Sequence, residues 1–253
     1  MKITFLGTGT SQGVPVIACS CPICQSTDSK DKRLRTSVLI EDGDSTFTID
    51  AGPDFRQQML KTKVKKLDAI LVTHGHKDHV GGMDDIRSFN WIQRKAMPVY
   101  ADEFAAQSIR AEFSYAFAYD KYPGVPDFNL LPITEKTIHI GEVEIIPIPL
   151  MHLKLPVHGF RIKDFSYITD ANFIPEDSWE LLKGTKILVI NALRKKKHIS
   201  HFNLEEALEI IEKIKPEQAY LIHISHLMGF HKIVSTELPN NVQIAYDGLI
   251  LDI

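Results

Sequence analysis

The chain of 253 residues is 44% hydrophobic and 24% charged, which is the composition of an ordinary globular protein, and it is long enough for one domain with a large core. Its formal net charge of −3 gives no general attraction to nucleic acid or to an anionic membrane surface. No segment approaches the roughly 18 apolar residues of a membrane-spanning helix, and the first residues lack the apolar run of a signal peptide. We therefore expect a single cytoplasmic domain over residues 1–253, without a membrane partner.

The first half of the chain is predicted to begin with strands and to continue with helices. Apolar runs separated by turn residues predict strands over 2–6, 36–41 and 45–49. A short helix is then expected over 54–61, a strand over 68–73, a helix over about 82–95 and a strand over 98–101. Asp102 can cap a helix that runs to about Tyr119, and the proline-rich stretch 120–132 is predicted to be a surface loop.

The second half repeats the order of strands followed by helices. Strands are expected over 143–149, 157–162, 165–169, 186–190 and 218–223, with two more in 243–252. Asn203, followed three residues later by Glu206, forms a capping-box pattern before a helix over 207–214. Two such halves facing each other predict an α/β fold in which two sheets pack together and the helices lie outside.

The side chains with the most specific chemistry follow the strand predicted at 68–73. They are His74, His76, Asp78 and His79, and so many ligand-type residues in one short loop cannot all reach a single ion. The spacing divides them into a first pair, His74 with His76, and a second pair, Asp78 with His79. Imidazole with carboxylate suits Zn, Mn or Fe, and two adjacent ions suit the hydrolysis of phosphate esters. The loop also lies at the carboxyl end of a strand, where open α/β sheets place their sites.

Three more ligand candidates in the second half, His152, Asp170 and His223, also follow predicted strands. A site at a common edge of the two sheets would collect all of them. The expected ligand sets are His74, His76 and His152 for one ion and Asp78, His79 and His223 for the other, with Asp170 between them. Asp170 is assigned to both ions because a carboxylate can bridge two metals, whereas a neutral imidazole cannot. A hydroxide shared by the two ions would be the nucleophile.

This pattern resembles the metallo-β-lactamase superfamily over essentially the whole chain. The segment His74-Gly-His-Lys-Asp-His79 matches the signature of the superfamily, and Ile49-Asp-Ala-Gly52 matches its first motif. The resemblance implies a four-layer αββα sandwich and a metal-dependent hydrolase with Asp78 and Asp170 at the reaction centre. It also implies that Asp50 orders the ligand loop without binding a metal itself.

The three cysteines, Cys19, Cys21 and Cys24, lie within six residues of one another, which does not suggest a disulfide framework. With His226 they have the ligand types of a closed tetrahedral zinc site; the alternative is three buried free cysteines. The combination is similar to the phosphodiesterase family of the carbon–phosphorus lyase pathway, which cleaves a ribosyl cyclic phosphate. That resemblance implies one structural zinc beside a dinuclear site that holds Mn or Zn.

The same resemblance assigns a role to a histidine that precedes the helix predicted at 207–214. In that family such a histidine assists phosphate binding and protonates the leaving group. His201 fits the position better than His198 because it directly precedes the capped helix, although a surface role for either residue stays open. The basic run 194–197 beside them could attract an anionic substrate, and Arg33 and Arg35 could also reach a phosphate.

We therefore expect a dinuclear metal-dependent phosphodiesterase that hydrolyses a small or cyclic phosphodiester. The first alternative is a tRNA 3′-processing ribonuclease of the same superfamily, which carries a long tRNA-binding arm between the positions of His152 and Asp170. Only 17 residues lie between them in this chain, so a large nucleic acid is not expected as a partner. The second alternative is a non-catalytic metal-binding or nucleotide-binding module, against which the complete ligand set argues. Formation of a homodimer is left open.

Overall fold

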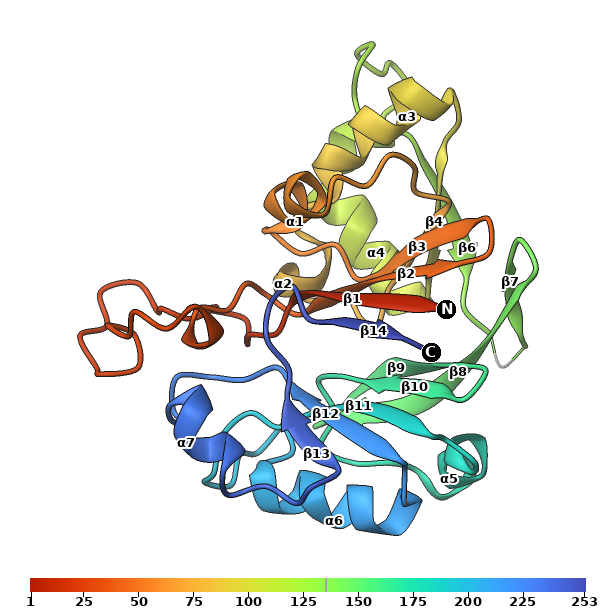
Figure 1. Ribbon diagram of the computed structural model, residues 1–253. Helices are drawn as coiled ribbons and strands as arrows, with labels where there is room; N and C mark the ends of the chain where they lie inside the picture. The colour runs from red at the N-terminus through yellow and green to blue at the C-terminus, as the bar shows by residue number, and fades with distance from the viewer. Residues whose placement is uncertain (135) are drawn as a thin grey trace.

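Two seven-stranded sheets pack face to face in the computed structural model, which describes residues 1–134 and 136–253 (Figure 1). The first sheet has the order β14-β1-β2-β3-β4-β5-β6 and the second has the order β13-β12-β11-β10-β9-β8-β7. The strands of the first sheet are β1 (Lys2–Gly7), β2 (Ser37–Asp42), β3 (Ser45–Ile49), β4 (Ala69–Leu71), β5 (Met97–Ala101), β6 (Phe128–Pro132) and β14 (Ile250–Asp252). Those of the second are β7 (Ile138–Ile140), β8 (Val143–His152), β9 (Leu155–Ile162), β10 (Phe165–Ile168), β11 (Ile187–Asn191), β12 (Gln218–Ile222) and β13 (Val242–Ile244).

The core between the sheets is built from the inward-facing residues of both. Phe5, Phe47, Phe160, Phe165 and Tyr167 are fully buried there. Alternate residues of the same strands face outward and pack against helices, because successive side chains of a strand point to opposite faces. Each sheet combines antiparallel and parallel pairs; β3 to β6 pair in parallel, as do β10 to β13.

Helices cover both outer faces, as Figure 1 shows, and complete four layers. On the first sheet lie α1 (Phe55–Thr62), α3 (Arg87–Gln93) and α4 (Glu103–Glu112), and on the second lie α5 (Glu176–Leu182), α6 (Leu204–Ile214) and α7 (His231–Ser235). The remaining helices are the short α2 (Lys77–Val80) and the 3₁₀ turns η1 (Ser29–Asp31), η2 (Met83–Ile86) and η3 (Ser114–Ala116). The predicted αββα sandwich is thus confirmed. Within the described ranges no helix is long and apolar enough to cross a membrane.

Several local predictions from the sequence are wrong. Residues 128–132 form strand β6, although the sequence predicts a loop over 120–132. The one proline of β6, Pro132, is tolerated because β6 is the edge strand of its sheet. The helix capped by Asp102 ends at Glu112 and not near Tyr119, and the helix expected over 82–95 is divided into η2 and α3. The capping box of Asn203 and Glu206 is present as predicted.

A long loop between β1 and β2 extends away from the sandwich, as Figure 1 shows. This arm comprises residues 10–35. The buried Arg33 ties its base to the domain. Its guanidinium Nη1 donates to Thr8 Oγ1 at 2.7 Å and to the Ala245 carbonyl at 2.6 Å. Arg35 forms an ion pair with Asp54 at 2.9 Å. Both arginines therefore anchor the arm to the protein.

Candidate metal centre

The predicted ligands lie at one common edge of the two sheets. His74 and His76 follow β4, Asp78 and His79 lie on α2, and His152 ends β8. Asp170 and His223 come shortly after β10 and β12. Side chains from both halves of the chain are therefore brought together, as the sequence predicted.

Backbone conformation helps to turn the chain at this edge. Asp50, Asp170 and His223 have φ values of 66°, 52° and 56°, in the left-handed region that non-glycine residues seldom adopt. Each of the three residues lies within two positions of the end of a strand. Such backbone strain concentrates at functional sites, where the surrounding structure holds it in place.

One group of ligand atoms consists of Asp78, His79, Asp170 and His223, and all of these atoms lie within 4.8 Å of one another. Nε2 of His79 is 3.2 Å from Oδ2 of Asp78 and 3.2 Å from Oδ2 of Asp170. Nε2 of His223 is 3.1 Å from Oδ1 of Asp170. Ligand atoms that share one zinc-sized ion lie about 3 to 3.5 Å apart, so this group has the geometry of a cation site.

The other predicted group, His74, His76 and His152, lies beside it. Nε2 of His74 is 3.0 Å from Nδ1 of His76, and the ring centroids of His76 and His152 are 5.3 Å apart. Nδ1 of His152 donates to the carbonyl of Ser200 at 2.7 Å, which leaves Nε2 as the free ligand atom. His152 and Asp170 also form a cluster with His201, with ligand-type atoms within 4.8 Å of one another.

The electrostatics of the first group also fit a cation. Burial alone would lower the pKa of His223, but the carboxylates of Asp170 and Asp78 outweigh it and raise that pKa to about 9. The pKa of His79 is likewise held well above its usual range by Asp170, Asp50 and Asp78 against the effect of burial. The buried Nε2 atoms of both histidines have no hydrogen-bond partner among the described residues. A divalent ion would satisfy these atoms and supply the positive charge that the carboxylates favour.

Asp50, which the resemblance predicts to order the ligand loop, contacts this group through His79. Nδ1 of His79 donates to Oδ2 of Asp50 at 2.6 Å, and both side chains are buried. The backbone N–H and the hydroxyl of Thr73 donate to the same carboxylate at 2.8 and 2.9 Å. The role of Thr73 was not predicted; its position next to His74 is the signal that could have indicated it.

Asp50→Asn should lower the affinity for metal by about 10- to 100-fold with little loss of fold. The amide is isosteric but presents a donor where His79 also donates, so the imidazole loses the partner that fixes its orientation. Metal titration of the variant, followed by calorimetry, measures the change. Thr46→Ala, a distant change in β3, should bind metal as the parent does; equal effects of the two would refute the role of Asp50.

The three cysteines converge on His226, which supplies a fourth ligand that the sequence alone could only suggest. The Sγ atoms of Cys19, Cys21 and Cys24 lie 3.3, 3.4 and 3.3 Å from Nδ1 of His226. Sulfur and nitrogen ligands of one tetrahedral zinc are about 3.5 Å apart, so the four atoms fit that ion. The backbone N–H of Cys24 donates to Cys21 and lowers the pKa of that thiol to about 6, which favours the thiolate form.

His201 lies closer to the metal centre than His198. Nδ1 of His201 is 3.8 Å from Oδ1 of Asp170, and its ring centroid is 4.6 Å from that of His152. His198 stacks on the far side of His201, with the ring centroids 5.2 Å apart. Burial first, and then the charge of His223, lowers the pKa of His201 to about 3. A further negative charge near His201, in addition to that of Asp170, would favour its protonated form; a bound phosphate would supply such a charge.

The nearby basic run is largely engaged with the protein itself. Arg194 donates to the carbonyls of Lys196 and Lys197, and Lys195 forms an ion pair with Glu237. These contacts give the loop before His201 a defined shape.

Two mixed sheets with outer helices, and a histidine–carboxylate cluster at their common edge, define the metallo-β-lactamase class of fold. A family model of the β-lactamase superfamily domain matches residues 45–224. The chain belongs to this superfamily.

The solved structures agree with this assignment. The chain is similar to a diphosphatase from the PhnP family, with 38% identity and a TM-score of 0.93 over 100% of this chain and 97% of that one. Two more distant structures share the fold. They are zinc-bound PqqB from Methylobacterium extorquens (19% identity, TM-score 0.81, 100% of both chains) and human short-form tRNase Z (17% identity, TM-score 0.73, 100% of this chain and 99% of that one).

Among curated proteins, the chain is 39% identical over 252 residues to an octanoyltransferase of Porphyromonas gingivalis. The match covers 98% of this chain and 51% of that protein, so the chain spans about half the length of this relative. A ribonuclease Z of Anoxybacillus flavithermus is 26% identical over 64% of this chain and 48% of its own length. The family and its similarity to the PhnP branch are thus confirmed, and they support a hydrolase.

Proposed function

We propose that the chain is a dinuclear metal-dependent phosphodiesterase that hydrolyses a small or cyclic phosphodiester. The observation that carries the proposal is the position of Asp170, whose carboxylate lies close to His79 and His223 and also clusters with His152 of the other group. The convergence of the cysteines on His226 and the similarity to a PhnP-family diphosphatase support the same branch of the superfamily.

Each of the two ions would have its own group of ligands. His74, His76 and His152 would hold one divalent ion, and Asp78, His79 and His223 the other, with Asp170 shared. Two such ions, Mn or Zn, lower the pKa of a water and neutralise charge on a phosphate when bound. Asp50 would orient the imidazole of His79 through its Nδ1. His201 lies beside Asp170, where it can donate a proton to the departing oxygen once an anionic substrate favours its charged form.

A small substrate fits the structure better than tRNA does. The residues between His152 and Asp170 form the hairpin of β9 and β10, which belongs to the second sheet. This segment is therefore used in the sandwich and does not form an arm. The similarity to human tRNase Z, at 17% identity, extends to the fold alone.

Acyl transfer, as named for the Porphyromonas gingivalis relative, is the less favoured function. About half of that relative lies outside the match, and its named activity need not belong to the matched half. A thiol nucleophile would have to be free, whereas all three cysteines of this chain lie against His226. The histidine–carboxylate edge favours hydrolysis.

Metal analysis together with a substrate panel tests the proposal. We expect about one zinc and two further ions per freshly purified chain. Bis(p-nitrophenyl) phosphate, a ribosyl cyclic phosphate and a dinucleoside diphosphate should be assayed with Mn and with Zn, and a precursor tRNA at physiological salt. Hydrolysis of a small diester supports the proposal; an inert metal-loaded protein, or efficient trimming of the tRNA, contradicts it.

His201→Asn should slow hydrolysis according to the leaving group. We expect a loss of about 100- to 10,000-fold for a diester with an alkoxide leaving group, because that oxygen needs a proton as the bond breaks. The loss should be much smaller for p-nitrophenolate, which leaves without protonation. His198→Asn is the matched control and should hydrolyse the diester as the parent does. A larger loss of rate in His198→Asn than in His201→Asn would identify His198 as the proton donor.

A further inference from the structure

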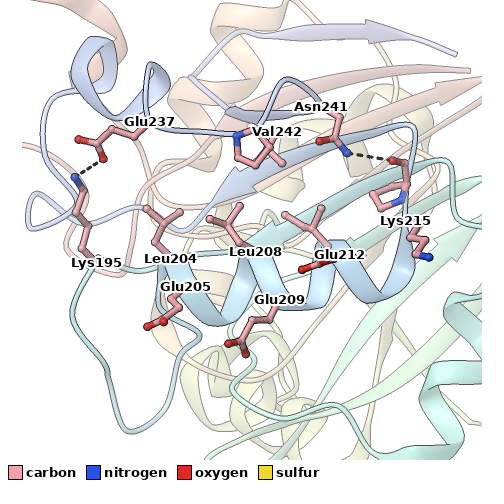
Figure 2. Close-up of a pocket in the computed structure, with 13 residues that line it drawn as sticks. Lys195, Leu204, Glu205, Leu208, Glu209, Glu212, Lys215, Glu237, Asn241 and Val242 are labelled. Carbon is pink, nitrogen blue, oxygen red and sulfur yellow. Dashed lines mark hydrogen bonds and ion pairs between the residues drawn. The ribbon is translucent and has the colours of Figure 1, made fainter.

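A groove on the outer face of the second half lies between α6 and the segment that leads into β13 (Figure 2). Its volume is about 730 Å³. The apolar part of the lining is Leu204, Leu208, Ile211, Pro216, Pro239 and Val242. None of the predicted metal ligands lines it, so the groove is separate from the metal centre.

The apolar lining arises because α6 has more apolar side chains than the sheet below it covers. Ala207, Ile210 and Ile211 are buried against the second sheet. Leu204 and Leu208, one helical turn apart, are only partly buried and point into the groove in Figure 2. Two partly exposed leucines at this spacing can pack against the apolar side chains of another helix.

Three carboxylates follow the groove along α6. Glu205, Glu209 and Glu212 are exposed, and none forms an ion pair within the described part of the chain. Like charges at such spacing repel each other and destabilise a helix slightly. Lys213, which has the i,i+4 spacing to neutralise Glu209, instead lies with its Nζ 3.3 Å from the centroid of the Trp179 ring. Lys215 also lines the groove, and Lys195 is paired with Glu237, so the three glutamates outnumber the remaining lining cation and leave the margin with a net negative charge.

Contacts at both ends limit the groove, as the dashed lines in Figure 2 show. Lys195 and Glu237 form an ion pair of 2.5 Å at one end. At the other, the side-chain amide of Asn241 donates to the carbonyl of Pro216 at 3.4 Å. These contacts fix both ends of the 237–242 segment to the chain on either side of α6.

We propose that this groove docks an amphipathic helical segment of a partner protein. Its apolar side chains, spaced one turn apart, would pack on Leu204 and Leu208, and lysine or arginine residues on its flank would face Glu205, Glu209 and Glu212. Charge complementarity selects this occupant, because an acidic or neutral segment would leave the three carboxylates repelling one another. The inference is independent of the proposed hydrolase activity.

The test uses a fluorescent 14-residue peptide of leucine and lysine, with leucines at i, i+4 and i+7, and the metal-loaded protein. Fluorescence anisotropy at low and at physiological salt measures binding. The triple variant E205Q/E209Q/E212Q should bind about ten-fold more weakly at low salt, since rim charges contribute most there. Leu208→Glu should also weaken binding, by removing an apolar contact.

A matched variant, E103Q/E142Q/E144Q, changes the net charge by the same amount on other surfaces and should bind the peptide as the parent does. Hydrolysis of the phosphodiester should be unchanged in all of these variants. Equal weakening in both triple variants, or equally tight binding of a peptide with scrambled leucines, would overturn the proposal. So would self-association of the protein, measured by sedimentation, that the groove variant abolishes, because a second copy would then be the occupant.

Discussion

Asp170→Asn should reduce phosphodiester hydrolysis by about a thousand-fold or more. The amide matches the carboxylate in shape, but it cannot carry the negative charge that faces both His79 and His223. We therefore expect loss of activity together with loss of at least one metal ion per chain. Turnover of bis(p-nitrophenyl) phosphate and elemental analysis of the same preparation measure both effects.

The control for this change lies in the adjoining hairpin. Asp164 is exposed and pairs with Lys186 on the surface, so Asp164→Asn should retain metal and activity. His76→Ala should resemble Asp170→Asn, because it removes a ligand of the other ion. Unchanged turnover in Asp170→Asn would show that the proposed mechanism is wrong.

Cys24→Ser should remove one zinc per chain and destabilise the arm. Cys24 is buried, and burial raises the pKa of its thiol to about 11, so without metal it lies in the protein as an uncharged group. The loss of a structural metal costs several kcal/mol, which in a domain of this size lowers the melting temperature by about 10 °C. Calorimetry measures the melting temperature, and elemental analysis measures the zinc content.

Limited proteolysis distinguishes local from global effects of that change. We expect cleavage within residues 10–35 at protease concentrations that leave the parent intact. Ser20→Ala, in the same arm but without a contact to His226, is the matched control. A Cys24→Ser variant that keeps its full zinc content would refute the site.

The sequence predicted those features that depend on local pattern. Ligands at the ends of apolar runs could be recognised because strand ends meet at a sheet edge, and Asn203 with Glu206 could be recognised because capping acts within four residues. Strand β6 was missed, since its stability comes from pairing with β5 and not from its own proline-containing sequence. The carbonyl of Ser200, which orients His152, could not be predicted either, because it depends on chain geometry 48 residues away.

The same reasoning explains why the groove beside α6 was not foreseen. The helix itself was predicted from its apolar spacing and cap, but the position of Pro239 and Val242 opposite it depends on how β13 joins the sheet. A pattern of apolar residues indicates which face of a helix is buried. It does not indicate which part of that face its neighbours leave uncovered.

The left-handed backbone at Asp50, Asp170 and His223 has a consequence for how this centre can change during evolution. Aspartate, asparagine and histidine are the non-glycine residues that adopt this conformation most readily. A substitution to glutamate at Asp170 or His223 would offer a new metal ligand but would strain the backbone that positions it. Selection for a different metal preference should therefore proceed first through His74, His76 or His152, which lack this restriction, and leave the three turning residues unchanged.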